Sequence, residues 1–474
     1  MTAQSDTRTP IVIIGGGATG AMVAWHILRL RPDLGRHGVT IIEPREQLGA
    51  GQAYGTHDTQ HRINVPASRM SLQTAKPCDF RDWLDLDALA AVDPDAFLPS
   101  GDLYPSRALF GRYLAARLAP YLETGRLRHL RGTAEDVTQE GKDWKIAVSE
   151  GRSLLARRLV LATTHPAPSL PAPLAPLAQE PRIIGNPWRD DALSRIAPQD
   201  RVAIIGTGLT MADIVASLTA RGHSGEILAF SRRGLRPRAH APQASALSDI
   251  LRLIPSTTAL GLLQRIRSAL REHADLSWHE IIDAVRKQGR GLWGALNEVE
   301  RRRLIRHLRP FWDVHRFRIA PQVDHILQTR LNEGRLTLGA ARLLSAEATA
   351  DGIVLTLKTR GGAEETRVVD HVVNTTGPNH AGIVRHTPYL RALAAAGLLE
   401  ADPVGLGLHT GADHHARVGT RSIPDLLIAG PLSRGQFGEL MGLPEVTENA
   451  QSVASAIASL VPQTPHVFSD EVRS

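Results

Sequence analysis

A run of apolar residues followed at once by glycines constrains the fold of this chain more than any other feature. Residues 11–14, IVII, are typical of a strand that is buried on both faces. The sequence GGGATG follows, residues 21–30 have the apolar spacing of a helix, and residues 39–43 form a second short apolar segment. The order strand, glycine turn, helix, strand predicts a βαβ unit and therefore a parallel sheet.

The glycines of this turn have the GxGxxG spacing of a dinucleotide-binding loop. Gly15 would make the tight turn, Gly17 would let the backbone approach a pyrophosphate, and Gly20 would let the helix pack closely on the strand. Backbone N–H groups around Thr19, in the first helical turn, would bind the phosphates. Glu43 ends the second strand, where a carboxylate accepts hydrogen bonds from ribose hydroxyls and repels a 2′-phosphate. The unit predicts a site for FAD or NAD; a glycine turn without a ligand is the alternative.

A second strand–glycine–helix unit lies near the middle of the chain. Residues 202–205 are apolar, two glycines follow, and residues 209–220 have helical spacing. Met211 stands where the third glycine would be, so the motif is degenerate. The positions that would face a nucleotide are the two glycines and the first two helical residues: Gly206, Gly208, Leu209 and Thr210.

The end of the next strand gives this second unit a different charge. Ser231, Arg232 and Arg233 stand where the first unit has its carboxylate. A hydroxyl and guanidinium groups suit a 2′-phosphate, so the unit favours NADPH over NADH. A solvated pair of charges at a strand end is the alternative. Two sites of opposite charge preference predict that NADPH reduces a bound flavin.

The composition excludes several other classes of protein. Cys78 is the only cysteine, so the chain can form neither an internal disulfide nor a CxxC redox pair. Without a stretch of about 18 apolar residues or a secretory signal pattern, we expect a cytoplasmic protein that does not span a membrane. The net charge of +7 comes from scattered arginines and only 4% of residues are aromatic, so we expect no nucleic-acid partner. The histidines of residues 409–415 lie in a polar loop pattern, and we expect no metal site.

The positions of the two units predict an α/β fold with two Rossmann-like dinucleotide-binding domains and a helical insertion. Residues 166–181 are rich in proline and typical of a linker. From about residue 245 to 309 the pattern is amphipathic helix with dense arginine, and extended segments return at 335–338, 353–358 and 368–374. The predicted divisions are an FAD-binding domain of residues 1–170 and 368–474, an NADPH-binding domain of residues 180–240 and 316–367, and a helical insertion of residues 241–315.

Several stretches besides the glycines resemble a known family. They are GAGQAYG at 49–55, RINVPASRMS at 62–71, RHLRPFWDVHR at 306–316, NTTGP at 374–378 and the closing segment at 427–450. With the two glycine units, they make the chain resemble the bacterial FAD-NAD(P)-binding proteins. That family is similar in layout to single-component flavin-dependent monooxygenases, including enzymes that hydroxylate amine nitrogens. The resemblance covers nearly the whole chain, although residues 162–164, ATT, lack the glycine of the expected ATG-type turn.

The resemblance implies further contacts with the cofactors. Gln52 and Asn64 would lie against the flavin, and Gly377 would turn the chain back into the flavin domain. Gly430 and Pro444 belong to the closing flavin motif, in which a helix N-terminus would face the isoalloxazine carbonyls.

The expected activity is that of an FAD-dependent oxidoreductase reduced by NADPH. Specifically, we expect a monooxygenase that acts through a flavin C4a-hydroperoxide on a small amine or other nucleophile, with O2 as co-substrate. Trp312, His315 and Arg318 are the candidate substrate-side residues; a helix end with Trp312 in the core is the alternative. No catalytic acid or base is identified, and the oligomeric state stays open. An FAD-dependent dehydrogenase or reductase with another electron acceptor, or a nucleotide-binding sensor without turnover, are the alternative functions.

Overall fold

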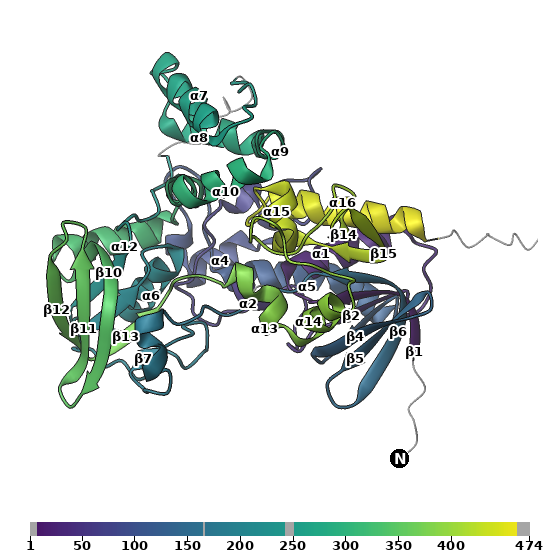
Figure 1. The fold of residues 1–474 in the computed structure, drawn as a ribbon, viewed down its shortest axis with the longest axis horizontal. Coiled ribbons are helices and arrows are strands. Elements are labelled where there is room, and N and C mark those ends of the chain that lie inside the picture. Colours follow the sequence, from purple (N-terminus) through teal and green to yellow (C-terminus); the bar gives the residue numbers. More distant parts are fainter. Residues whose placement is uncertain (1–6, 165, 242–250, 462–474) are drawn as a thin grey trace, which may run out of the picture.

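The computed structural model of this chain contains two sheets with parallel central strands, and each sheet is built around one of the predicted glycine units. The structure describes residues 7–164, 166–241 and 251–461. The two sheets occupy opposite ends of the molecule, and a group of helices projects above the region between them (Figure 1). No helix among these residues is both long and apolar enough to cross a membrane.

The first sheet has the N-terminal strand at its centre, and residues 11–14 of this strand are buried, as the sequence predicts. Its strands from β15 to β3 are parallel neighbours, and β4 (Ala134–Glu140) and β5 (Asp143–Val148) form an antiparallel extension of β6. The spatial order is β14 (His415–Val418), β15 (Arg421–Ile428), β6 (Arg152–Leu161), β1 (Thr7–Ile14), β2 (Val39–Ile42) and β3 (Leu127–Leu130).

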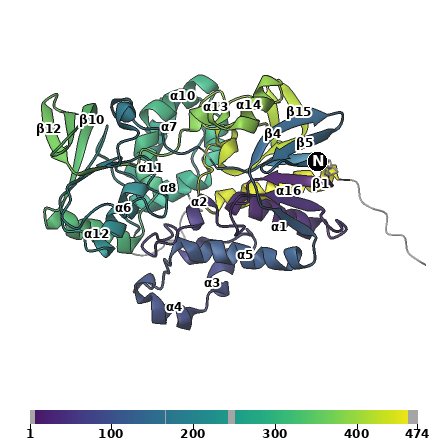
Figure 2. The ribbon, with the colours of Figure 1, turned by 90° about the horizontal axis from the view of Figure 1, so that it is seen from below.

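Alternate residues of β1 pack on opposite layers. Ile11 and Ile13 belong to a core shared with α1, α5 and α16, whereas Val12 and Ile14 face β4, β5 and α14. Figure 2 shows α1 and α5 on one side of this sheet and β4 and β5 on the other. The helices of this part are α1 (Ala18–Leu30), α2 (Gly51–Tyr54), α3 (Asp79–Trp83), α4 (Leu86–Val92), α5 (Arg107–Glu123), α13 (Ile383–His386), α14 (Pro388–Ala395), α15 (Arg434–Phe437) and α16 (Glu445–Leu460).

The second sheet repeats this arrangement around the second glycine unit. The strands from β10 to β7 are parallel neighbours, β11 and β12 extend β10 as an antiparallel ribbon, and α6 (Leu209–Ala220) packs with α12 (Pro321–Asn332). The spatial order is β12 (Glu364–Val369), β11 (Gly352–Thr359), β10 (Leu336–Thr349), β9 (Ile227–Ser231), β8 (Val202–Ile205), β13 (His371–Asn374) and β7 (Ile183–Ile184).

The division predicted at residue 368 was wrong in one detail. The extended segment 368–374 is split between β12 and β13, and both strands lie in the second sheet. Strand β13 pairs with β8 in parallel, from His371 opposite Val202 to Asn374 opposite Ile205. Apolar β13 completes the buried centre of that sheet, so the return to the first domain comes after residue 374.

The predicted insertion is helical, although its residues 242–250 lie outside the described part. No strand occurs in its described residues, 241 and 251–315. Leu262, Val285, Leu292 and Leu296 form a small separate core inside it. Its helices are α7 (Ala259–Glu272), α8 (Trp278–Lys287), α9 (Gly289–Gly294), α10 (Glu298–His307) and α11 (Arg309–Arg316), the last of which ends at the return to the second domain.

Replacing Gly20 tests how tightly the first unit is packed. A Cβ at Gly20 would overlap the carbonyl oxygen of Gly15, so we expect Gly20→Ala to lower the free energy of unfolding by about 2 kcal/mol or more. Urea unfolding followed by tryptophan fluorescence measures this. Gly35→Ala is the control, since nothing lies within 4 Å of a Cβ there; equal midpoints for the two variants would contradict the packing argument.

Candidate functional site

The first glycine turn fits an anion at the start of α1. Gly15 has a φ of +103°, and a Cβ there would come 2.7 Å from the carbonyl oxygen of Ala162, the residue after the neighbouring strand β6. Gly17 is the N-cap of α1, no side chain caps this helix, and its first turn carries no acidic residue. The backbone N–H groups at Thr19 and its neighbours therefore remain available to a phosphate.

The carboxylate of Glu43 lies against this turn, where the sequence places it. Its Oε2 accepts a hydrogen bond from the backbone N–H of Gly16 at 2.9 Å, and the residue is only 4% exposed. Its Oε1 accepts from the backbone N–H and from Nη1 of Arg45, both at 3.2 Å. A buried carboxylate held beside a glycine turn is the arrangement that binds a ribose.

Two segments distant in sequence close on the same turn. A Cβ at Gly430, whose φ is +67°, would lie 2.5 Å from Oγ1 of Thr19. The backbone N–H of Gly430 donates to Oδ1 of Asn449 on α16 at 2.7 Å. The helix α2, which carries Gln52, begins at Gly51, whose Cα lies 3.4 Å from the position of a Cβ at Gly17. The structure thus brings Thr19, Gly430 and the helix that carries Gln52 together at one turn. Pro444 is the N-cap of α16, the helix that carries Asn449.

Asn64 lies at a contact between the two domains that the sequence did not reveal. Its backbone oxygen accepts a hydrogen bond from Nε2 of His240 at 3.0 Å. The Tyr104 ring lies 5.2 Å from the imidazole, between centroids. Burial, with the nearby charge of Arg318, lowers the pKa of His240 to about 4, so the imidazole is neutral at pH 7.

The second glycine turn has the same construction and a more open face. Gly206 has a φ of +119°, and a Cβ there would lie 2.5 Å from Oγ1 of Thr375. Gly208 is the N-cap of α6, and a Cβ there would meet nothing within 4 Å. The first helical turn, with Leu209 and Thr210, carries no acidic residue and no side-chain cap. Gly377, with a φ of +85°, also faces open space.

The three residues at the end of β9 are used differently from one another. The hydroxyl of Ser231 accepts from the backbone N–H of Gly234 at 3.0 Å and lies 2.8 Å from that of Thr207. Because Thr207 donates its own proton to the carbonyl oxygen of Leu235, the Ser231 proton goes to Thr207. Ser231 is thus engaged within the protein and supports the turn.

The two arginines also differ. Arg233 reaches toward the insertion, where its guanidinium lies 5.2 Å from the Phe311 ring centroid. Arg232 is exposed and makes no hydrogen bond or ion pair with any described residue. Of the three predicted 2′-phosphate contacts, Arg232 alone has its full set of donors available.

Buried polar contacts hold the first domain against α6 of the second. Arg107, at the start of α5, forms an ion pair with Asp213 at 2.9 Å, and Nε2 of His61 lies 3.1 Å from Oγ of Ser217. A cavity of about 770 Å³ borders this contact, and Gln52 is among the residues of the first domain that line it. That volume is within the range of small-molecule sites.

The three predicted substrate-side residues do not converge on one point. Nε1 of Trp312 donates to Oε2 of Glu439 at 3.1 Å, and its ring packs against the small core of the insertion. His315 packs edge-on against Trp278, and the guanidinium of Arg318 lies 5.4 Å from the centroid of the same ring. The alternative interpretation, Trp312 as a packing residue at a helix end, agrees with these contacts.

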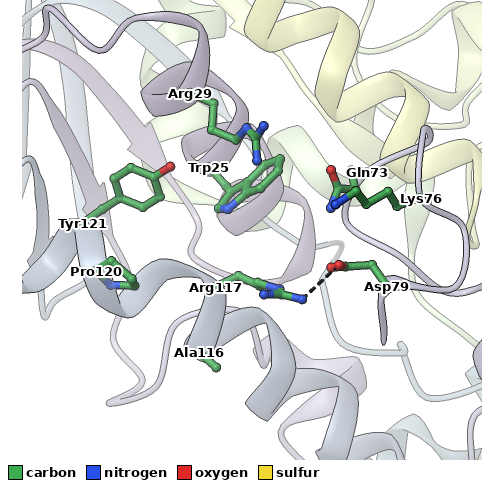
Figure 3. Close-up of a pocket in the computed structure, with 9 residues that line it drawn as sticks. All are labelled: Trp25, Arg29, Gln73, Lys76, Asp79, Ala116, Arg117, Pro120 and Tyr121. Carbon is green, nitrogen blue, oxygen red and sulfur yellow. Dashed lines mark hydrogen bonds and ion pairs between the residues drawn. The ribbon is translucent and has the colours of Figure 1, made fainter. Parts of the chain in front are cut away.

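A smaller cavity lies away from both glycine turns. Its volume is about 300 Å³, and Trp25 and Arg29 of α1 and Arg117 of α5 are among its walls (Figure 3). Neither cavity borders a metal site, because no group of three or more metal-ligating side chains occurs among the described residues.

Comparison with known proteins agrees with the geometry of the first turn. Residues 12–166 match the model of a family described as FAD-NAD(P)-binding. This part of the chain is similar to that family. The match begins in β1 and includes the glycine turn and Glu43, so the predicted FAD-NAD(P)-binding family and cofactor pair are confirmed. None of the curated proteins matches the chain.

Solved structures establish the fold over nearly the whole chain. An ornithine hydroxylase from Pseudomonas aeruginosa has a TM-score of 0.66 at 16% identity, with 96% of this chain and 99% of that chain covered. The ornithine N-hydroxylase of Kutzneria sp. 744, in a complex named for reduced FAD, NADP⁺ and L-ornithine, has a TM-score of 0.63 at 16% identity and covers 95% and 99%. The bacillithiol disulfide reductase of Staphylococcus aureus follows at 0.56 and 14%, covering 96% and 98%. The FAD-NAD(P)-binding fold with two dinucleotide-binding domains is thereby confirmed.

His240 makes the contact between the two domains sensitive to acid. Its pKa is lowered from 6.5 to about 4 in the folded protein, so its stabilising contribution is full above pH 6.5 and is lost as the pH falls toward 4. The variant His240→Gln keeps a hydrogen-bond donor for Asn64. We expect its free energy of unfolding to fall by about 2 kcal/mol less than that of the wild type when the pH is lowered from 7 to 5.

Urea unfolding at both pH values measures this difference. His307→Gln, at an exposed position on α10, is the control. Equal pH dependence in His240→Gln and the wild type would contradict the prediction.

Proposed function

We propose that this protein is an FAD-dependent monooxygenase reduced by NADPH and acting on a small amine or other nucleophilic substrate. The observation that carries the proposal is the pair of glycine turns with opposite charge environments. Glu43 lies 2.9 Å from the backbone N–H of Gly16 in the first turn, whereas exposed Arg232 follows the strand beside the second. The first suits the ribose of FAD, and the second suits the 2′-phosphate of NADPH.

In this proposal the residues of the chain bind and orient the two cofactors and enclose the site between the domains. The N-termini of α1 and α6 hold the two pyrophosphates, and the Arg107–Asp213 pair fixes one domain against the other. When bound, FAD supplies two-electron transfer between NADPH and dioxygen. The overall reaction consumes NADPH, a proton and O2, adds one oxygen atom to the substrate, and releases NADP⁺ and water.

The similarity to a reductase supports a second candidate function. The fold is shared with a bacillithiol disulfide reductase at a TM-score of 0.56. Cys78 is the only cysteine, so a dithiol mechanism inside this chain has no second thiol. An FAD-dependent NADPH dehydrogenase or reductase that passes electrons to another acceptor is therefore the second candidate.

Absorption spectroscopy and oxygen uptake separate these functions. We expect the purified protein to show the flavin band near 450 nm, to bleach it anaerobically with NADPH, and to consume O2 with an amine in proportion to hydroxylated product. Reoxidation only by a quinone or carrier protein would favour the reductase. A colourless protein that binds no added FAD would overturn both functions and favour a nucleotide-binding sensor.

Arg232 is the residue on which coenzyme choice depends in this proposal. We expect Arg232→Ala to raise the KM for NADPH roughly 10- to 100-fold, the value of a lost charge-assisted hydrogen bond, and to leave the KM for NADH within about twofold. Arg233→Ala is the matched control, because its guanidinium lies over Phe311. Steady-state kinetics with both coenzymes measures this, and an equal loss with NADPH and NADH would argue against a 2′-phosphate contact.

A further inference from the structure

Two arginines on helices of the insertion bind the carboxylate of Glu445, the first residue of α16. Arg286, on α8, donates to both carboxylate oxygens of Glu445 at 2.5 and 2.7 Å and to the backbone oxygen of Leu443 at 2.6 Å. Arg316, the last residue of α11, lies 3.2 Å from the same carboxylate and 3.0 Å from that of Glu439. These contacts join the insertion to the closing segment of the first domain.

Of the four charges of this cluster, Arg316 is buried and the other three are partly buried, and their signs balance. The side chain of Arg316 is 3% exposed and that of Glu439 is 7% exposed, and Arg286 and Glu445 are each 17% exposed. Burial opposes ionisation of Glu445, but hydrogen bonds from Arg286 and the charge of Arg316 keep its pKa below the ordinary value. The cluster therefore holds two positive and two negative charges, and each is paired.

Glu445 lies on a helix that borders the proposed flavin site. It begins α16, directly after the N-cap Pro444. One turn further on, Asn449 accepts the backbone N–H of Gly430, and Gly430 touches Thr19 in the first glycine turn. The N-terminus of a helix carries a partial positive charge, and an unbalanced carboxylate at its first residue would reduce the positive potential there.

We propose that Arg286 and Arg316 of the insertion are positioning residues of the flavin site: they hold Glu445 and balance its charge, so that the N-terminus of α16 keeps a positive field toward the isoalloxazine carbonyls. This rests on the proposed FAD site and is independent of the oxygenation step. It gives the insertion an electrostatic role in addition to any contact with substrate.

The proposal predicts shifts of opposite sign from the two halves of one ion pair. Reduction adds negative charge to the flavin, so removing a positive charge nearby disfavours the reduced state and removing a negative charge favours it. Arg316→Gln is expected to lower the flavin midpoint potential, and Glu445→Gln is expected to raise it. A purely structural role would move both variants in the same direction or leave both unchanged.

The experiment is potentiometric titration of the flavin-loaded full chain. We expect each single variant to change the ratio of reduced to oxidised flavin about tenfold at fixed potential, which is about 30 mV for a two-electron couple. The double variant Arg316→Gln/Glu445→Gln restores the charge balance and is expected to return to within a third of the single shifts. Arg367→Gln, which removes an exposed ion pair on β12, is the control and is expected to leave the potential unchanged.

Arg286→Gln replaces Arg316→Gln if the latter does not fold, because both arginines pair with Glu445. Same-sign shifts, or a double variant that adds the two shifts instead of cancelling them, would overturn the proposal. Wild-type protein that binds no flavin would instead overturn the FAD site on which it rests, so the two failures are distinguishable.

Discussion

Close backbone approach at two glycine turns is the constraint on which both halves of this molecule depend. At Gly15 the backbone passes Ala162 of the adjacent strand segment, and at Gly206 it passes Thr375, with no room for a Cβ at either point. Each approach lets a helix start directly at the carboxyl edge of its sheet, so the free N–H groups of α1 and α6 point out of the sheet edge. Side chains of larger size would force strand and helix apart and remove both proposed anion sites.

Local signals predicted the parts of the structure that neighbouring residues determine. The helix expected at 209–220 is α6 with those bounds, and Glu43 lies beside the turn as its spacing indicates. Extended segments were expected at 335–338 and 353–358, in β10 and β11, but the antiparallel pairing of β10 to β12 and of β4 with β5 was not predicted, because pairing depends on partners along the ribbon and not on a motif. The contact of His240 with Asn64 joins residues far apart in sequence, and no local pattern marks it.

The charges at the strand ends show how one scaffold can serve two ligands. The strand order β3-β2-β1-β6 in the first sheet has its counterpart in β10-β9-β8-β13 of the second. What differs is chemistry at equivalent points: a buried carboxylate follows β2, and exposed Arg232 follows β9. Sequence spacing alone does not distinguish the serine from the two arginines at the end of β9. The structure does, because the hydroxyl of Ser231 has hydrogen-bond partners within the protein and Arg232 has none among the described residues.

The discontinuity of the first domain sets the order in which the molecule can be completed during synthesis. Strand β13 closes the centre of the second sheet once residue 374 has emerged, whereas β15 and α16, which border the first glycine turn, come from residues 421–460. A nascent chain can therefore finish its second domain while the first still lacks Gly430 and the helix that supports it. The first glycine turn therefore gains these neighbours only from residues that follow the whole insertion in the sequence.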